Sequence, residues 1–432
     1  MEISRRECLE KFATTCSILA VEQLAVANNL PHNENGLTQG SDWEKVREQF
    51  LSARSPINFA GFLLAPHPKI VRQSLELLRD ELDRGPAQYL FSHWLDGNEV
   101  VRLAASEYMG VSKDNIALTD STTMGLGLLY HGLKLKPGDE VLTSNHDHYS
   151  THRSLSLASK KNGFSVRKID LYQDIKNVSE SEIVGAVLAG ISPTTKVLAL
   201  TWVHSSTGLK IPIKKIAEKI RELNTTRPQT RQILFCVDGV HGFGCEEQKV
   251  SELGCDFFVA GCHKWMFGPR GTGIIYGKDR AWEHVEPIIP NFDGVKQEKP
   301  SKGQLMTPGG FHSFEHRWAL AQAFKFHKLI GREKIAARVK DLNLRLKHGL
   351  LRNSKVSLYT PTDPELSAGI VCFDINGLSP EAVVANLRKK GIVGSQTPYK
   401  KSYARLSCGL LNNLDEVDFA IKALIDISQS YP

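Results

Sequence analysis

Two charged residues, Asp238 and Lys264, follow two apolar segments in the middle of the 432-residue chain. Residues 233–237 read ILFCV and precede Asp238, and residues 257–260 read FFVA and lead to His263 and Lys264. Short apolar runs of this kind predict buried strands. Because ligands of open α/β sheets bind beyond the carboxyl ends of the strands, we expect the carboxylate and the amine to flank one ligand. A carboxylate that keeps a ring nitrogen protonated and a lysine that forms a Schiff base are the groups that pyridoxal-phosphate chemistry requires.

A second polar cluster could bind a phosphate group. The predicted strand 115–118 is followed by TDSTTMG (119–125), which leads into an apolar helix. Free amides and the positive end of a helix dipole attract anions, so Thr122 and Thr123 are candidate phosphate ligands. Helix capping by Ser121 or Thr122 explains the same hydroxyl groups equally well. The residues alone leave both interpretations open.

Three further polar residues stand on predicted strands or at their ends. His148 follows the strand 140–143 and could lie flat over a planar ring, although a histidine in such a place is more often only hydrogen-bonded at the surface. Ser205 follows the strand 196–202. Arg405 lies within the apolar segment ARLSC (404–408), where it either pairs with a structural carboxylate or binds a substrate carboxylate through two hydrogen bonds.

The elements that must position these residues form two groups. Strands and helices alternate over residues 115–275, which predicts a mainly parallel sheet with helices on both faces. Residues 313–351 have a helical pattern, as one long helix or as two joined near Gly331, and lead to a second αβ domain. That domain has predicted strands at 369–375, near 392 and at 404–408, with helices at 380–390 and 414–428. Helices are also expected at 42–51, 69–82 and 93–110.

Composition excludes several classes of protein. The chain is 41% hydrophobic and 23% charged, as in ordinary globular proteins. Its net charge of +7 is spread along the sequence in short basic runs, so we expect no nucleic-acid partner. No stretch is apolar enough for a membrane span. The eight cysteines show no CxxC spacing and are interpreted mostly as small buried residues, and no metal site is expected.

The N-terminal residues have three features of a twin-arginine export signal. Arg5 and Arg6 precede the moderately apolar segment FATTCSILAV (12–21), and an AxA-like site lies at 25–27. This pattern predicts a periplasmic protein with a signal and linker over residues 1–41. The alternative is an amphipathic helix that packs on a cytoplasmic enzyme.

Seven motifs in order give the chain a resemblance to the class V aminotransferases, a family of fold-type-I pyridoxal-phosphate enzymes that includes the cysteine desulfurases. The HKW form and the GPRGTG turn make it most similar to the isopenicillin N epimerase-like branch. The motifs are DSTTMG (120–125), NHDHYSTH (145–152), TWVHSSTG (201–208), VDGVHGFG (237–244), HKWMFGPRGTG (263–273), MTPGG (306–310) and ARLSCGLLN (404–412).

This resemblance implies an α/β fold in which a large domain contains a mainly parallel seven-stranded sheet between helices. A smaller α/β domain would follow at the C-terminus. The implied large domain covers residues 42–315, with its N-terminal segment contributing to the small domain, and residues 316–432 form the linking helix and the small domain. The resemblance also implies a homodimer with the active site at the subunit interface.

The resemblance assigns a role to each candidate residue. Lys264 matches the lysine that forms the Schiff base and moves the α-proton, Asp238 the partner of the pyridine nitrogen, and His148 the ring-stacking histidine; these are the catalytic candidates. The other matches are cofactor ligands and one substrate ligand: Thr122, Thr123 and His263 at the phosphate, Thr307 at the phosphate of the neighbouring subunit, His241 and Ser205 near the ring hydroxyl, and Arg405 at the substrate carboxylate.

Departures from the family pattern affect the expected reaction. Gly261 stands where many relatives have a phosphate-binding serine, Met306 replaces a glycine, and Asn412 and Asn413 replace part of a YNT motif. The segment 391–407 lacks the mobile cysteine of desulfurases, which disfavours desulfuration because that reaction needs an activated thiol. We expect an enzyme that acts on an amino acid or an amino-acid-containing small molecule, with transamination as the main prediction. Epimerisation and C–S or C–X lysis are the alternatives, and a catalytically idle protein on the same fold is the remaining class.

Overall fold

The computed structural model describes residues 43–431 except residues 53 and 293–298. The expected export signal and linker lie outside the described residues. Within the described part, no helix has the length and apolar character needed to cross a membrane.

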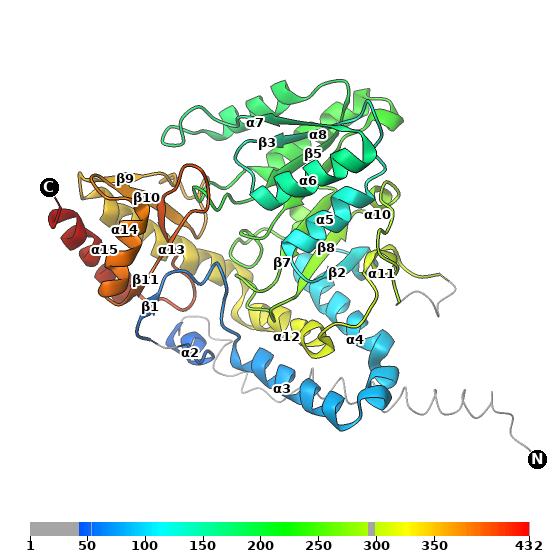
Figure 1. Ribbon diagram of the computed structural model, residues 1–432, viewed down its shortest axis with the longest axis horizontal. Helices are drawn as coiled ribbons and strands as arrows, with labels where there is room; N and C mark the ends of the chain where they lie inside the picture. Colours follow the sequence, from blue (N-terminus) through cyan, green and yellow to red (C-terminus); the bar gives the residue numbers. More distant parts are fainter. Residues whose placement is uncertain (1–42, 53, 293–298, 432) are drawn as a thin grey trace, which may run out of the picture.

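A seven-stranded sheet forms the centre of the large domain (Figure 1). Its strands lie in the order β2-β8-β7-β6-β5-β3-β4, and only β8 runs antiparallel to its neighbours. The mainly parallel sheet expected from the sequence is thereby confirmed. The strands are β2 (Ile116–Thr119), β3 (Glu140–Ser144), β4 (Ser165–Ile169), β5 (Thr195–Thr201), β6 (Leu234–Asp238), β7 (Phe257–Gly261) and β8 (Gly273–Gly277).

Helices cover both faces of this sheet because alternate strand residues point to opposite sides. In β7, Phe257 and Val259 belong to one apolar cluster, whereas Phe258 and Ala260 belong to the other. The first cluster packs against α5 (Thr122–Gly132) and α6 (Tyr149–Asn162). The second packs against α3 (Lys69–Arg84), α4 (Pro86–Met109), α7 (Glu180–Gly190), α8 (Ile213–Thr226) and α12 (Phe314–Ile330).

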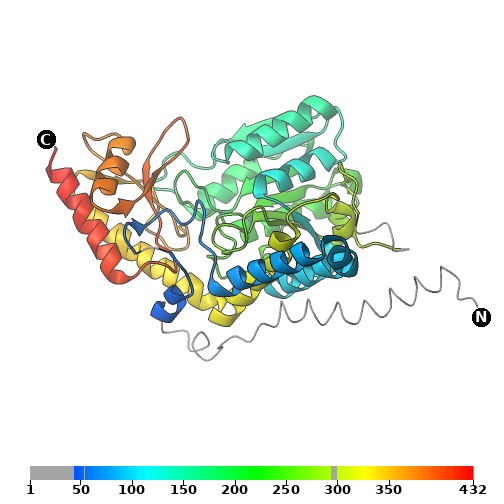
Figure 2. The same cartoon turned by 60° about the horizontal axis from the view of Figure 1, so that its bottom comes forward.

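A smaller antiparallel sheet with the order β12-β13-β10-β9 forms the C-terminal domain. Figure 2 shows its strands beside the C-terminal helix, at the end of the molecule away from the large sheet. Its strands are β9 (Val356–Leu358), β10 (Val371–Ile375), β12 (Ser395–Gln396) and β13 (Ala404–Leu406), and its helices are α13 (Arg332–Leu351), α14 (Pro380–Lys389) and α15 (Leu414–Gln429).

The N-terminal part of the described chain lies against this small domain. Strand β1 (Ile57–Asn58) pairs in parallel with β11 (Ile392–Val393). Arg47 of α2 (Trp43–Glu48) forms an ion pair with Glu416 of α15. The exact boundary between the domains stays a prediction.

The long helical pattern at 313–351 forms two helices. Gly331 separates α12 from α13 and has φ 98°, a conformation that residues with a side chain rarely adopt. The start of the helix predicted at 93–110 was wrong, since α4 begins at Pro86. Proline is favoured in the first turn of a helix. The sequence analysis did not anticipate β8 and β9, nor the short helices α9 (Val250–Leu253), α10 (Asp279–Trp282) and α11 (Lys302–Met306).

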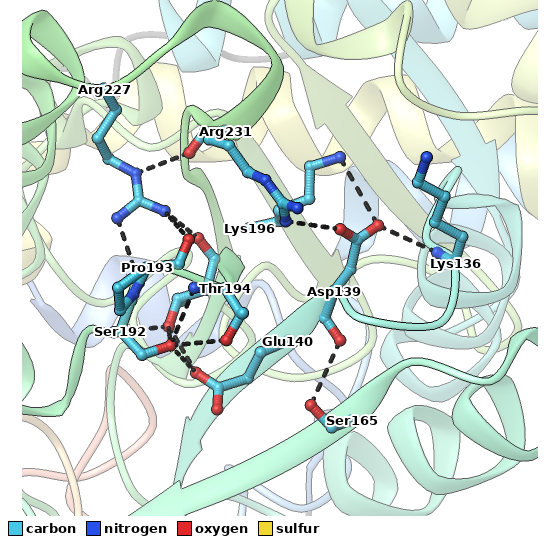
Figure 3. A network of polar contacts seen from close by, with 11 residues as sticks. Lys136, Asp139, Glu140, Ser165, Ser192, Pro193, Thr194, Lys196, Arg227 and Arg231 are labelled. Carbon is cyan, nitrogen blue, oxygen red and sulfur yellow. Dashed lines mark hydrogen bonds and ion pairs between the residues drawn. The ribbon is translucent and has the colours of Figure 1, made fainter.

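The amino ends of β3 and β5 carry a network of polar contacts (Figure 3). Asp139 is fully buried and lies 3.1 Å from Arg231 and 3.6 Å from Lys196. Arg227 donates to the carbonyl oxygens of Ser192, Pro193 and Thr195. These contacts fix the end of the sheet that lies opposite the carboxyl ends of the strands.

Candidate active site

Eight of the ten site residues predicted from the sequence meet in one cavity at the carboxyl ends of the strands. It is lined by Thr122, Thr123, His148, Ser205, Asp238, His241, His263 and Lys264, and also by Ser121, His146, Ser150, Thr201, Val203, His204 and Val240. These residues lie close together because β7, β6, β5 and β3 are adjacent in the sheet and all four strands end at the same edge.

Asp238 and Lys264 lie in this cavity, and burial shifts the pKa of each. Burial raises the pKa of Asp238 to about 6, although the amide of Val240, which donates to Asp238 Oδ1 at 3.2 Å, and the positive charge of Lys264 act against this rise. Burial lowers the pKa of Lys264 to about 8, and Arg405 acts in the same direction, whereas Asp238 opposes it. A lysine with a lowered pKa is partly neutral near pH 7, which makes it a nucleophile and a base.

Two histidines lie close to these groups as neutral rings. His241 Nε2 is 3.3 Å from Lys264 Nζ, and its Nδ1 is buried with no hydrogen-bond partner among the described residues. His148 caps α6, because its Nδ1 accepts a hydrogen bond from the amide of Ser150 at 3.1 Å. Burial, together with the positive charges of Lys264 and Arg405, lowers the pKa of His148 to about 4. A neutral ring fixed in this way can present a flat face to a planar ligand.

The start of α5 is compatible with both interpretations that the sequence left open. Ser121 is the capping residue, since its hydroxyl accepts from the amide of Met124 at 3.1 Å. The Thr122 hydroxyl accepts from the amide of Gly261 at 2.8 Å, whereas the Thr123 side chain is exposed at the cavity. A Cβ atom at Gly261 would lie only 3.0 Å from His263 Cε1 and 3.1 Å from Thr122 Oγ1. Glycine therefore keeps room open between Thr122 and His263.

Arg405 reaches this site from the small domain. Its side chain is buried, and its three nitrogens donate to the Ser395 hydroxyl at 3.0 Å, the Ser205 carbonyl at 2.8 Å and the Gln396 carbonyl at 3.1 Å. No carboxylate of the described residues forms an ion pair with it. A buried guanidinium whose partners are all neutral is suited to an anionic ligand.

Thr307 lies outside the cavity of its own chain. Its buried hydroxyl accepts from the amide of Leu118 at 3.0 Å and from Arg102 at 3.2 Å, and it donates to the carbonyl of Gly303 at 2.7 Å. A contact with a neighbouring subunit's phosphate would have to replace one of these bonds, so that role stays a prediction.

Val240 and Tyr399 are two of the residues at the site that the sequence analysis missed. Val240 lines the cavity two residues after Asp238, and no motif distinguished it from a core valine. The Tyr399 hydroxyl is 2.6 Å from the Ser205 hydroxyl. Tyr399 lies in a segment of 394–404 whose letters show no periodicity, so only the fold could place it.

None of the cysteines that the structure describes is an activated thiol. Cys236, Cys245, Cys255, Cys262, Cys372 and Cys408 are free and buried. Burial raises the pKa of each, to about 12 for Cys255 and Cys372. These thiols remain protonated at neutral pH and cannot attack a substrate.

The residues present fit pyridoxal phosphate. A buried carboxylate and a buried lysine with a lowered pKa line one cavity, as the ring nitrogen and the aldehyde require. Hydroxyl groups and a helix N-terminus offer a phosphate site beside Gly261. The buried Nδ1 of His241, which has no partner in the described part, is the kind of atom that a bound ligand satisfies.

This fold and this site define a fold-type-I pyridoxal-phosphate enzyme. The family model "Aminotransferase class-V" matches residues 92–418, and the chain belongs to that family.

Two curated relatives represent two kinds of enzyme. Isopenicillin N epimerase of Streptomyces clavuligerus is 24% identical over 411 residues, which cover 89% of this chain and 98% of the epimerase. A probable cysteine desulfurase of Halalkalibacterium halodurans is 27% identical over 356 residues, covering 76% of this chain and 82% of that protein.

Solved structures confirm the fold. A variant of C-DES with glycine covalently linked to its PLP cofactor has a TM-score of 0.79 at 20% identity, covering 88% of this chain and 99% of C-DES. The cysteine desulfurase CsdA of Escherichia coli has a TM-score of 0.76 at 18% identity, covering 90% and 98% of the two chains.

The main functional prediction, transamination, is not supported by these findings. The reported relatives are an epimerase and a desulfurase rather than transaminases, so the alternatives named from the sequence agree better with them. The residues that bind the cofactor are common to all these reactions, which is why the motifs could not separate them.

Proposed function

We propose that this protein is a pyridoxal-phosphate-dependent epimerase of an amino acid or of a small molecule that contains one. Asp238 would bind the ring nitrogen, and Thr122, Thr123 and His263 the phosphate. Lys264 would hold the cofactor covalently. When bound, the cofactor draws electrons away from the substrate α-carbon through its protonated ring.

Arg405 is the observation that carries the proposal. Its buried guanidinium reaches across from the small domain to Ser205 and has only neutral partners among the described residues. A substrate carboxylate would supply the missing negative charge, and two parallel hydrogen bonds would fix the α-carbon relative to Lys264.

Lys264 is the group that would remove the α-hydrogen. Its lowered pKa leaves part of the amine neutral near pH 7, as a general base requires. Loss of the proton would be reversible, and return of a proton to the opposite side of the α-carbon would give the epimer. The coverage of 98% of the Streptomyces clavuligerus epimerase supports this outcome over transfer of the amino group.

A substrate screen tests the proposal. The purified protein would be supplied with pyridoxal phosphate and incubated with single L-amino acids and with small peptides that carry a free α-amino carboxylate. We expect chiral chromatography to show the opposite epimer for at least one of them. Stoichiometric formation of a keto acid, with the amino group left on the cofactor, would instead identify a transaminase.

The second candidate is a C–S or C–X lyase. The observation that favours it over a thiol-dependent desulfurase is the absence of an exposed cysteine among the described residues, together with the lack of any cysteine in residues 391–407. The same Lys264 and Arg405 could support elimination from a substrate with a leaving group at its β-carbon. Release of pyruvate and sulfide or persulfide from L-cysteine or L-cystine would identify this activity.

We also propose that the enzyme works as a homodimer. Phe292 and Phe311 are 42% and 80% exposed, and their rings lie 6.1 Å and 6.0 Å from the ring of Trp94. Exposed aromatic side chains gathered at one place are typical of an interface. Sedimentation equilibrium should give twice the chain mass, and an active monomer would contradict the proposal.

Export through a twin-arginine signal remains a separate proposal from the sequence. Expression of the full chain in a Gram-negative host should place the protein in the periplasm, shortened near residue 27, and Arg5→Lys together with Arg6→Lys should keep it in the cytoplasm. An uncut wild-type protein in the cytoplasm would contradict export.

A further inference from the structure

The segment between β12 and β13 brings one tyrosine to the active site. Thr397 closes this hairpin, because its amide donates to the Tyr403 carbonyl and its hydroxyl accepts from the Tyr403 amide, both at 2.9 Å. Ser402 adds a third bond to the Thr397 carbonyl at 2.8 Å. The hairpin is therefore ordered, and Tyr399 extends from it toward the large domain.

Tyr399 contacts two residues that line the cofactor cavity. Its hydroxyl lies 2.6 Å from Ser205 Oγ, and its ring meets the His148 ring edge to face at 6.2 Å. The Ser205 carbonyl accepts a hydrogen bond from Arg405, so the tyrosine hydroxyl and the guanidinium contact the same serine through its side chain and its backbone. A carboxylate held by Arg405 would bring its α-carbon next to this hydroxyl.

Lys264 and the residues that Tyr399 contacts follow strands on opposite sides of β6. Along the sheet edge, Lys264 follows β7, Asp238 ends β6, Ser205 follows β5 and His148 follows β3. A cofactor ring bound at Asp238 would lie between Lys264, on the β7 side, and His148, on the β3 side. Because Tyr399 packs on His148 and Ser205, its hydroxyl belongs to the His148 side.

We propose that Tyr399 is the second acid–base residue of the active site, which delivers a proton to the face of the substrate α-carbon opposite Lys264. This inference rests on the proposed function and names the group that would give inversion. The O–H bond of the phenol breaks as the new C–H bond forms, the phenolate regains a proton from water, and the Lys264 ammonium releases to water the proton that it removed. In the reverse direction the phenolate, formed by loss of its proton to water, removes the α-hydrogen of the other enantiomer and Lys264 returns a proton. Ser205 would donate a hydrogen bond to the phenolate while it lasts.

The protonated form of the phenol is the one present before reaction. Burial raises the pKa of Tyr399 to about 12, although the Ser205 hydrogen bond and the charge of Arg405 act to lower it. Tyr399 is thus a proton donor at neutral pH, whereas the amine of Lys264 is partly neutral and accepts. At neutral pH one group can therefore give a proton to the substrate while the other can take one from it.

Hydrogen exchange at the α-carbon separates this role from a purely structural one. Wild-type enzyme, Tyr399→Phe and Tyr403→Phe would be loaded with pyridoxal phosphate and incubated in D₂O with each enantiomer of alanine and of the screened amino acids that lack a β leaving group. Nuclear magnetic resonance would measure deuterium at the α-carbon, and chiral chromatography would measure inversion. Glycine affinity, from an absorbance titration of the bound cofactor, gives a readout independent of turnover.

The expected result for Tyr399→Phe is an asymmetric loss. One enantiomer keeps exchanging its α-hydrogen within about threefold of wild type through Lys264, while inversion and exchange of the other enantiomer fall by at least about 10²-fold. Glycine affinity should stay within about threefold. Tyr403→Phe should behave as wild type, because the Tyr403 ring stacks on Tyr359 at 4.0 Å, within the small domain.

Each contrary result has a distinct meaning. Inversion that persists in Tyr399→Phe would overturn the inference and leave the epimerase proposal intact. Equal loss of exchange for both enantiomers with weakened glycine binding would overturn it too, because Tyr399 would then only position Ser205. Wild-type enzyme that exchanges but never inverts would overturn the epimerase proposal itself.

Discussion

Buried charged residues at the two ends of the large sheet differ in whether they form ion pairs. At the amino ends, Asp139 is held between Arg231 and Lys196, and Glu140 accepts a hydrogen bond from Arg167 at 2.8 Å. At the carboxyl ends, neither Asp238 nor Lys264 forms an ion pair with any described residue. Figure 3 shows Asp139 in contact with both Arg231 and Lys196.

This difference suggests that the paired residues stabilise the fold and that the unpaired residues serve the candidate active site. A buried charge without a partner costs free energy, so a fold keeps one only where a ligand will meet it. The paired charges at the amino end join strands β3 and β5, whereas Asp238 and Lys264 at the carboxyl ends keep charges that a cofactor and a substrate would use. The predictions below test this contrast, from the largest expected effect to the smallest.

Replacement of Lys264 should have the largest effect. Lys264→Ala removes the amine that attaches the cofactor and the base that removes the α-hydrogen, so kcat should fall by more than about 10³-fold. The visible absorbance of covalently attached cofactor should also be lost. Lys214→Ala, at an exposed position on α8, is the matched control and should leave both unchanged. Retained turnover in Lys264→Ala would refute the mechanism.

Replacement of Arg405 should weaken substrate binding and leave cofactor binding intact. Arg405→Lys keeps the charge but loses the planar fork, and kcat/KM should fall on the order of 10- to 100-fold, mainly through KM. Steady-state kinetics and the cofactor spectrum measure the two effects. Arg345→Lys is the control, because that arginine pairs with Asp418 at the surface. An unchanged KM in Arg405→Lys would remove the main support for an α-carboxylate substrate.

The lowered pKa of Lys264 should appear in the rate at which the cofactor-free protein takes up pyridoxal phosphate. Neutral amine increases as pH rises through the pKa of about 8, so the rate should climb about tenfold per pH unit below that value and then level off. Borohydride trapping and mass spectrometry measure this rate. In Asp238→Asn the midpoint should move to lower pH, because the carboxylate raises the pKa of Lys264. A midpoint near pH 10 would show that burial does not perturb the amine.

Changes at the amino ends of the strands should affect stability alone. Asp139→Asn removes the carboxylate that pairs with Arg231 and Lys196, so the free energy of unfolding should fall by about 1–3 kcal/mol. The loss stays moderate because both basic side chains are partly exposed and can turn toward water. Values of kcat and KM should not change. Denaturant unfolding measures the loss, and Asp418→Asn at the exposed Arg345 pair should cost less than about 1 kcal/mol. A large loss of activity in Asp139→Asn would contradict the separation of the two ends.

Much of this site follows from local sequence. Apolar runs that end in Asp238 and precede Lys264 predict strands, and the parallel order brings their ends together, so the cavity was expected from the motifs. The two readings of the TDSTTMG segment proved compatible, since Ser121 caps the helix while Thr122 and Thr123 line the cavity. The start of α4 was misplaced because the residues after Pro86 show no clear amphipathic pattern.

The sequence by itself determined the family and indicated the cofactor and the candidate pair Asp238 and Lys264, because these depend on residue types at fixed positions after strands. Only the tertiary structure decided which side chains from distant segments complete the site. Tyr399 meets Ser205 across 194 positions of sequence, and Arg405 meets it across 200. Such contacts arise from the packing of the small domain on the large one, and no local pattern encodes them.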